Sequence, residues 1–339
     1  MDEAYNILLS PRLRECPDPL LRGLPLTHRR TYFLLGTAVE VHSNSARVIA
    51  ASDHSFSRYG EPSPQTKPSI VIRIAVDTDP LRTNSKPWPT PHYRALHHLF
   101  HISCGDHNFA VADLTTGTAI GFVTEEMAQD LAFFCPTFLE CLFYLQAVHR
   151  NLTPVHCSCV CWKGSAILIC GVGGTGKSTL AYACGKARMQ IVSDDVVHLA
   201  QDDNGGGLLL WGNPWTLRLM PDAGALFSEL GSIVPESRHG GELYLSVDVL
   251  KHCQGGICLR SQPSLLLFLE RNPNVNCELS RLPSSAVWKR LRQDMVLDTQ
   301  EVIERHDALL GKLAQFPAYR MEYSGHPSSV TELMKTLVS

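Results

Sequence analysis

Residues 171–179 read GVGGTGKST, that is Gly171, Val172, Gly173, Gly174, Thr175, Gly176, Lys177, Ser178 and Thr179. This order matches the phosphate-binding pattern G-x-x-x-x-G-K-[ST] at every position. The glycines permit backbone conformations in which N–H groups turn inward toward an anion. In this pattern Lys177 reaches the outer phosphates and the hydroxyl of Ser178 holds Mg²⁺. We therefore predict that residues 171–179 bind ATP together with Mg²⁺.

The segments on either side of this loop have the required character. Residues 166–170 form a short apolar run typical of a buried strand, and residues 178–188 are typical of a helix. A helix in this position points the positive end of its dipole at a bound phosphate. The order strand, loop, helix favours a nucleotide site over the alternative, a glycine-rich turn that binds nothing.

The composition is that of an ordinary soluble globular protein. The 339 residues have room for two domains, with 44% hydrophobic and 19% charged residues. A net charge of −3 gives no reason to expect nucleic acid or an anionic membrane as a partner. The apolar segment 131–148 contains Pro136, Glu140 and Gln146, so we expect a buried helix rather than a membrane span. The sequence is compatible with a homo-oligomer and does not decide the oligomeric state.

The cysteines indicate a reducing compartment. The chain has 12 of them and does not start with a secretory signal, so we expect reduced thiols, no zinc and a cytoplasmic location. Cys157, Cys159 and Cys161 alternate along the sequence and would share one face of a strand. A metal site is the alternative, but no C-x-x-C pair occurs, and small buried apolar side chains explain the pattern better.

The first part of the chain, residues 1–153, is predicted to be a small α+β domain of unknown role. Residues 1–30 are rich in proline and irregular. Helical sequence begins at Thr124 and continues, bent at Pro136, to about residue 149. The predicted strands are 32–35, 38–41, 46–50, 69–76 and a hairpin formed by 109–113 and 119–123.

The second part, residues 154–339, is predicted to be an α/β domain that contains the phosphate loop. Besides the helix at 178–188, helices are expected at 284–296, 299–314 and 328–338. The predicted strands are 155–162, 165–170, 190–193, 208–211, 216–219, 243–247, 264–269 and 318–323.

Two adjacent acids, Asp194 and Asp195, follow the predicted strand 190–193. Such a pair suits phosphoryl transfer, because one carboxylate can act on Mg²⁺ while the other accepts a proton from an attacking hydroxyl. The alternatives are a solvated acidic turn, or a cap for a helix at 196–199.

The arrangement of His156, the loop 171–179 and the strand that ends in Asp194 and Asp195 resembles the catalytic core of HPr kinase/phosphorylase. That family consists of bacterial protein-serine kinases whose nucleotide site is similar to that of phosphoenolpyruvate carboxykinase. The spacings resemble those of the family, with 15 positions from His156 to Gly171 and 17 from Lys177 to Asp194. Residues 211–219 look more like the HPr kinase-related proteins. The resemblance covers about residues 154–220.

The resemblance implies a phosphate ligand in Lys177 and a Mg²⁺ ligand in Ser178. It implies a general base in Asp194, with Asp195 at the metal and His156 in support, although the two aspartate roles can be exchanged. The family's Glu-x-Arg-Gly-x-Gly segment does not occur between 196 and 260, so the second metal ligand is open and HPr is not the expected substrate. Arg218 is placed to act on the transferred phosphoryl group, or else forms a surface salt bridge.

The sequence as a whole therefore predicts an ATP- and Mg²⁺-dependent kinase of the HPr kinase-like type. Its acceptor would be a hydroxyl group, on a serine of a peptide or protein or on a small molecule. Two alternatives remain: an inactive nucleotide-binding regulator, and a phosphorylase that runs the reverse reaction.

Overall fold

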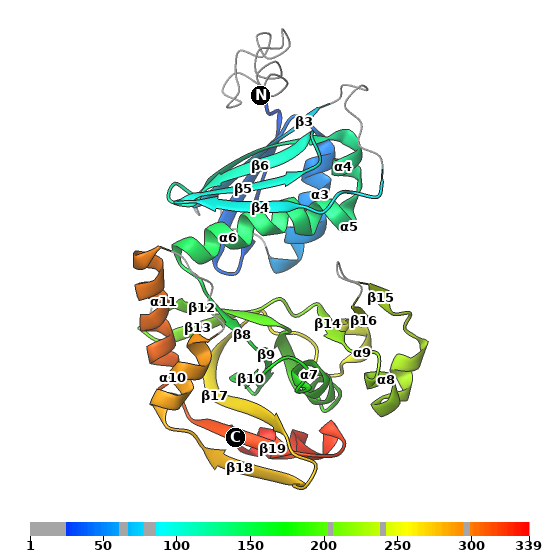
Figure 1. Cartoon of the computed structure of the whole chain (residues 1–339), viewed down its shortest axis with the longest axis vertical. Coiled ribbons are helices and arrows are strands. Elements are labelled where there is room, and N and C mark those ends of the chain that lie inside the picture. Colours follow the sequence, from blue (N-terminus) through cyan, green and yellow to red (C-terminus); the bar gives the residue numbers. More distant parts are fainter. Residues whose placement is uncertain are drawn as a thin grey trace, which may run out of the picture. The chain divides into compact units, whose positions relative to one another are not determined.

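The computed structural model describes residues 25–60, 67–77, 86–202, 206–237, 242–293 and 299–338. The chain forms two compact units that divide between Arg150 and Asn151. This division lies three residues before the boundary expected from the sequence. Each unit has its own sheet and its own helices (Figure 1).

The first unit contains a seven-stranded mixed sheet. Parallel pairing joins β2 to β3 and β3 to β7, and the other neighbours are antiparallel. Burial alternates along β3, so one face of the sheet is covered; the helices α3 (Ala46–Phe56) and α6 (Cys141–Arg150) contact the sheet. In sheet order the strands are β1 (His28–Leu34), β2 (Thr37–Ser43), β3 (Ile70–Asp77), β7 (Thr118–Thr124), β6 (Asn108–Asp113), β5 (Leu99–Cys104) and β4 (His92–Leu96).

The strand predicted at 46–50 is wrong, because these residues begin helix α3. The side chain of Ser45 caps this helix by accepting a hydrogen bond from the backbone N–H of Arg47. Val48, Ala51 and Ser52 are buried with the helical spacing of three to four residues. The periodicity over the longer segment 46–56 outweighed the strand propensity of its first five residues.

The helical sequence predicted after Thr124 is confirmed, and Thr124 caps it through a bond from Met127 N. Helices α4 (Glu125–Gln129) and α5 (Leu131–Phe134) are followed by a π-helical segment (Cys135–Glu140) that contains Pro136, and then by α6. By length and composition, Leu131–Arg150 could cross a membrane, with a mean hydropathy of 1.6. However, half of it is buried in the structure, and core helices of soluble proteins have the same pattern.

The second unit contains a branched nine-stranded sheet. Its core consists of β9 (Ser158–Trp162), β10 (Ser165–Cys170), β11 (Gln190–Ser193), β17 (Arg260–Arg271), β18 (Cys277–Arg281) and β19 (Ala318–Tyr323), and β10, β17 and β19 run parallel. The branch at the start of β17 consists of β13 (Leu208–Trp211), β12 (Val196–Gln201) and β8 (Thr153–His156). A separate three-stranded sheet contains β14 (Thr216–Leu219), β16 (Leu243–Asp248) and β15 (Glu236–Ser237).

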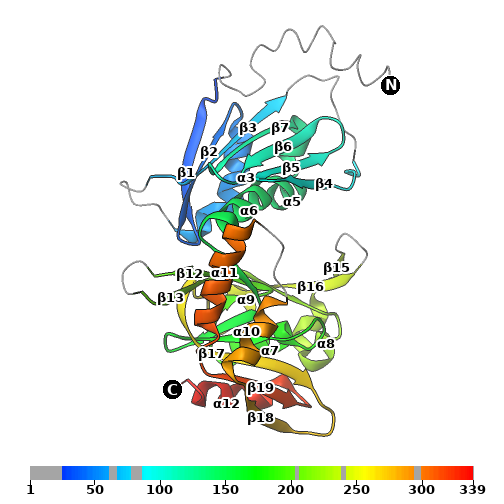
Figure 2. The same cartoon turned by 60° about the vertical axis from the view of Figure 1, so that its left-hand side comes forward.

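Helices cover both faces of the nine-stranded sheet (Figure 2). Ile167 and Ile169 pack toward α7 (Lys177–Lys186), whereas Leu168 packs toward α10 (Ser284–Arg292) and α11 (Gln300–Leu313). This is why residues 166–170 form a continuous apolar run, as buried strands of parallel sheets do. The short helices of the unit are α8 (Ala223–Leu226), α9 (Val249–His252) and α12 (Thr331–Thr336).

The segment 155–162, predicted as one strand, consists of β8 and β9, which divide at Cys157 and pair with different strands. The helix considered for 196–199 is strand β12 instead. Cys157, Cys159 and Cys161 do share a face, buried in the same core cluster. All eleven cysteines in the described residues are free thiols, and Cys16 lies outside those residues.

We expect Gly212→Ala to lower the free energy of unfolding by about 3 kcal/mol, because it overpacks a buried site. A Cβ atom at Gly212 would lie 1.8 Å from the backbone oxygen of Val192. Urea unfolding measures the change. Gly231→Ala is the matched control, since a Cβ at Gly231 meets nothing within 4 Å; an equal loss in both variants would contradict the steric explanation.

We expect stability to depend on pH through His198, on β12. Burial lowers the pKa of His198 to about 4 from its usual 6.5. The unfolded chain therefore takes up this proton first as the pH falls from 6.5 toward 4, and stability is lost in that window, by about 2 kcal/mol between pH 7 and pH 5. His198→Gln should remove this loss in thermal unfolding, whereas substitution of the exposed His92 should not.

Candidate functional site

The loop predicted to bind phosphate connects strand β10 to helix α7, in the expected order. Gly174 and Gly176 have φ angles of 79° and 94°, in the left-handed region that residues with a Cβ rarely adopt. The hydroxyl of Thr175 donates to Val172 O at 2.8 Å and holds the turn. A Cβ at Gly173 or Gly174 would meet nothing within 4 Å, so the loop borders open space.

Lys177, the first residue of α7, folds back across the loop. Its Nζ donates to Gly171 O at 2.8 Å and lies 3.4 Å from Val172 O, and the residue is only 8% exposed. The ammonium group is therefore held against two loop carbonyls. An anion in the loop would gain a positive charge that is already in position.

Asp194 lies at the same edge of the sheet as the loop. Strand β9 runs antiparallel to both β10 and β11, so β10 and β11 end at one edge. The carboxylate of Asp194 accepts hydrogen bonds from Ser158 Oγ and from Arg218 N, both at 2.8 Å, and it also bonds the Ser178 hydroxyl. Burial raises the pKa of Asp194, and these hydrogen bonds oppose the rise.

Asp195 has a different environment, although it is the next residue. Its φ angle of 72° is left-handed, which costs a residue with a side chain on the order of 1 kcal/mol and is commoner at functional sites. Asp195 lines a cavity of about 310 Å³ together with Lys177, Ser178 and His156. The solvated acidic turn considered for the pair does not describe Asp194, whose carboxylate is bonded on both oxygens.

Two cavities meet at the loop. The first is the cavity lined by Asp195, whose wall also contains Arg218, Tyr244 and Leu243. The second, of about 840 Å³, is lined by apolar residues such as Val155 and Phe268 and by basic residues of α10. Three residues line both cavities, so the site extends to both sides of the loop; they are His156, Gly173 and Arg271.

Arg271 is a site residue that the sequence reasoning missed. It ends strand β17, which lies parallel to β10 and therefore ends at the same edge. Its Nε donates to Thr175 O at 3.2 Å, and its guanidinium lies 4.6 Å from the centre of the Tyr323 ring. A Cβ at Gly176 would come within 2.9 Å of Arg271 Nη2, so this glycine also makes room for the arginine. The sequence feature that could have marked Arg271 is its position at the end of a long apolar run.

The donors around the Asp195 cavity suit Mg²⁺. Ser178, Asp195, Asp222 and Glu242 all line it and offer oxygen ligands, and Mg²⁺ prefers one or two carboxylates completed by phosphates and water. Within the described ranges, no group of three or more His, Cys, Asp or Glu residues is placed to hold a metal by itself. Glu242 is a candidate for the second carboxylate, at a position that no motif in the sequence marked.

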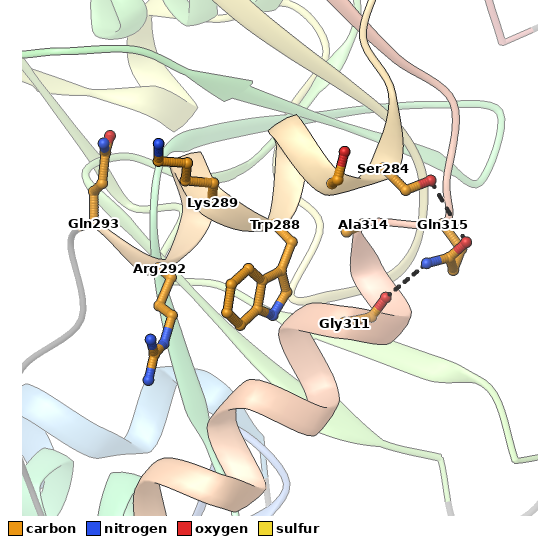
Figure 3. A pocket seen from close by; sticks show the side chains of 9 residues that line it. Ser284, Trp288, Lys289, Arg292, Gln293, Gly311, Ala314 and Gln315 are labelled. Carbon is orange, nitrogen blue, oxygen red and sulfur yellow. Dashed lines mark hydrogen bonds between the residues drawn. The ribbon is translucent and has the colours of Figure 1, made fainter.

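A further hollow of about 710 Å³ lies between α10 and α11 (Figure 3). Trp288 and Arg292 stand side by side in it, and Gln315 bonds Ser284 and Gly311. Its lining includes no acid and no histidine. It therefore offers no general base, although Lys289 lines both this hollow and the larger cavity at the loop.

No family model and no curated protein matches the chain. Among solved structures, the chain is similar to the Hpr(Ser) kinase/phosphatase from Coxiella burnetii, with 17% sequence identity and a TM-score of 0.31. The match covers 55% of this chain and 93% of that one. The similarity is distant, and the case for function therefore rests on the geometry of the chain itself.

Proposed function

We propose that the protein is an ATP- and Mg²⁺-dependent kinase that transfers the γ-phosphoryl group to a hydroxyl. The observation that carries this proposal is the meeting of three elements at one sheet edge: the loop with Lys177, the hydroxyl of Ser178 and the acid pair 194–195. Phosphoryl transfer needs positioning and charge neutralisation more than covalent chemistry. The loop, Lys177 and Arg271 supply positive groups and N–H donors for the phosphates.

The environments of the two acids favour the exchanged assignment, in which Asp195 is the general base. A base must first reach the proton that it removes, and only then does its pKa matter. Asp195 is among the residues that line the cavity beside the loop and Asp194 is not; the carboxylate of Asp194 accepts hydrogen bonds from Ser158, Ser178 and the backbone N–H of Arg218. With this assignment, the carboxylate of Asp194 would orient the hydroxyl of Ser178 toward Mg²⁺. His156 would lie beside both Asp195 and the phosphates.

We assign the two cavities to the two halves of the reaction. The larger one has apolar walls for a flat base and ribose, with Lys289 and Arg290 beside the loop. The smaller one contains Asp195 and Arg218 and would receive the acceptor hydroxyl, on a serine of a peptide or protein or on a small molecule. The free thiols of the described cysteines suit work in a reducing cytoplasm.

The test is incubation of the full chain with γ-labelled ATP, Mg²⁺ and a panel of serine peptides and small alcohols. Label should appear in an acceptor only when Mg²⁺ is present, and slow release of phosphate to water should occur without one. Nucleotide binding with neither transfer nor hydrolysis would instead support the regulator. Release of label from a phosphoserine peptide by phosphate would support the phosphorylase.

A further inference from the structure

Two cysteines of the second unit, although distant in the sequence, lie close enough to hydrogen-bond to each other. Cys161 is on β9, and Cys258 is in the segment that leads into β17. The side chains of Cys161 and Cys258 hydrogen-bond to each other, and the Cys258 thiol also donates to Arg260 O at 3.1 Å. The sulfur of Cys161 also lies 3.5 Å from Ser261 Oγ. The fold therefore pairs two cysteines that 97 positions of sequence separate.

The pairing makes the two thiols chemically unequal. The hydrogen bonds with Cys258 and Ser261 lower the pKa of the Cys161 thiol, and the bond with Cys161 raises the pKa of Cys258. Thiolates are the nucleophilic form of cysteine, and a depressed pKa marks the reactive member of a pair. Cys161, which lines a cavity and has the lower pKa, is the candidate for the attacking sulfur, and Cys258, which lines the same cavity, is the candidate for the resolving one.

The two cysteines border a cavity. Both cysteines line a cavity of about 350 Å³, together with Gly164, Gln190 and Arg260. Cys161 itself is only 1% exposed and Cys258 is partly buried, so a large disulfide reagent would not fit onto Cys161. A reagent the size of water would reach it through the cavity.

We propose that Cys161 and Cys258 form a redox-active dithiol that hydrogen peroxide converts into an intramolecular disulfide. The Cys161 thiolate attacks one peroxide oxygen, the O–O bond breaks, and a sulfenic acid and one water form after proton uptake. The Cys258 sulfur then attacks the sulfenic sulfur, the S–O bond breaks, and a second water leaves with the proton of Cys258. Two electrons pass from the two sulfurs to the peroxide, and a thiol reductant reverses the change.

The disulfide would change the position of β11, the strand that directly precedes the acid pair. Cys258 N donates to Ile191 O at 2.8 Å, and Ile191 N donates to Gly256 O at 3.0 Å, so residues 256–258 are bonded to β11. An S–S bond of about 2.05 Å is shorter than a hydrogen-bonded separation of sulfurs, so closing it draws this segment toward β9. Because β11 ends directly before Asp194, oxidation would move the base of the acid pair; its effect on catalysis rests on the function proposed above.

A second pair of cysteines tests whether the closeness of two thiols is by itself sufficient for oxidation. Cys157 and Cys170 also form a hydrogen bond, but burial raises the pKa of Cys157 and both lie in the core. If closeness were sufficient, this pair would oxidise as readily as Cys161 and Cys258. If the acidity of Cys161 is what matters, the pair Cys157 and Cys170 would stay reduced, although Cys170 also lines a cavity.

The experiment treats the native full chain with hydrogen peroxide, blocks the remaining thiols and maps cross-linked peptides by mass spectrometry. We expect a reversible Cys161–Cys258 cross-link with loss of two hydrogens, and reduced Cys157 and Cys170. In Cys258→Ser, a sulfenic acid on Cys161 should accumulate and be trapped when the oxidised protein is denatured in the presence of dimedone. No cross-link between 161 and 258, or an equally fast cross-link between 157 and 170, would overturn the proposal.

The same oxidised sample tests the effect on β11. Hydrogen exchange at residues 190–193 should change on oxidation of the wild type and should not change in Cys258→Ser. Unchanged exchange in a fully cross-linked sample would overturn the proposed link between the dithiol and the acid pair. Neither measurement depends on a known phosphoryl acceptor.

Discussion

For the proposed kinase, we expect Asp195→Asn to lower the rate of phosphoryl transfer by about 10²-fold or more, the usual scale for the loss of a positioned proton acceptor. ATP affinity changes little, because the loop and Lys177 still hold the phosphates. Asparagine has the same shape and also tolerates the left-handed φ of 72° at this position, so the fold is preserved. Steady-state rates of ADP release, with nucleotide binding by calorimetry, separate the two effects, since a loss of rate with binding retained indicates a transition-state interaction.

The matched control is Asp194→Asn, one residue away. Asp194 is expected to orient Ser178, so this variant should need more Mg²⁺ for half-maximal rate while it recovers much of its activity at high Mg²⁺. The variant should also fold more favourably at neutral pH. Burial disfavours the charged form of Asp194, as its raised pKa indicates, and asparagine carries no charge. Full activity in Asp195→Asn, with a metal-independent loss in Asp194→Asn, would restore Asp194 as the base.

We expect Lys177→Ala to abolish the stabilisation that ATP with Mg²⁺ should give the wild type. For the wild type, a ligand at 100 times its dissociation constant stabilises the folded state by about 2.7 kcal/mol, which a thermal shift assay detects readily. The variant loses the ammonium group of Lys177, which lies 2.8 Å from Gly171 O. Its unliganded melting temperature should fall modestly, because a hydrogen bond from a charged donor contributes about 1.5–3 kcal/mol.

Lys251→Ala serves as the control for charge alone. Lys251 is 76% exposed and pairs with Asp248 on the surface, outside the residues that line either cavity at the loop. Its removal changes the net charge by the same amount and should leave the ATP shift intact. An undiminished shift in Lys177→Ala would mean that the nucleotide binds elsewhere.

The motif 171–179 could be predicted from the sequence because it depends on local backbone geometry. Four glycines, a lysine and a hydroxyl at fixed spacing specify a turn between a strand and a helix, and the structure has that turn between β10 and α7. The buried strands were predictable for a similar reason: β11 and β19 have the predicted bounds, since short apolar runs between turn residues indicate strands.

Where local signals conflicted, the sequence was less reliable. Residues 46–50 have strand propensity, yet they lie in α3, because burial of one helical face over eleven residues outweighs propensity over five. The division of 155–162 into β8 and β9 was equally hidden, because both halves are apolar and only their partners differ.

The sequence by itself determined which residues could bind phosphate and that two acids follow the next strand. Only the tertiary structure decided how those two acids differ. Ser158 and the backbone N–H of Arg218, both remote in sequence, donate hydrogen bonds to Asp194, whereas Asp195 lines the cavity. It also brought Arg271 to the loop and Cys258 to Cys161. The physical reason is that hydrogen bonding, burial and pKa depend on neighbours that the sheet order supplies, and strand order is not encoded in any local pattern.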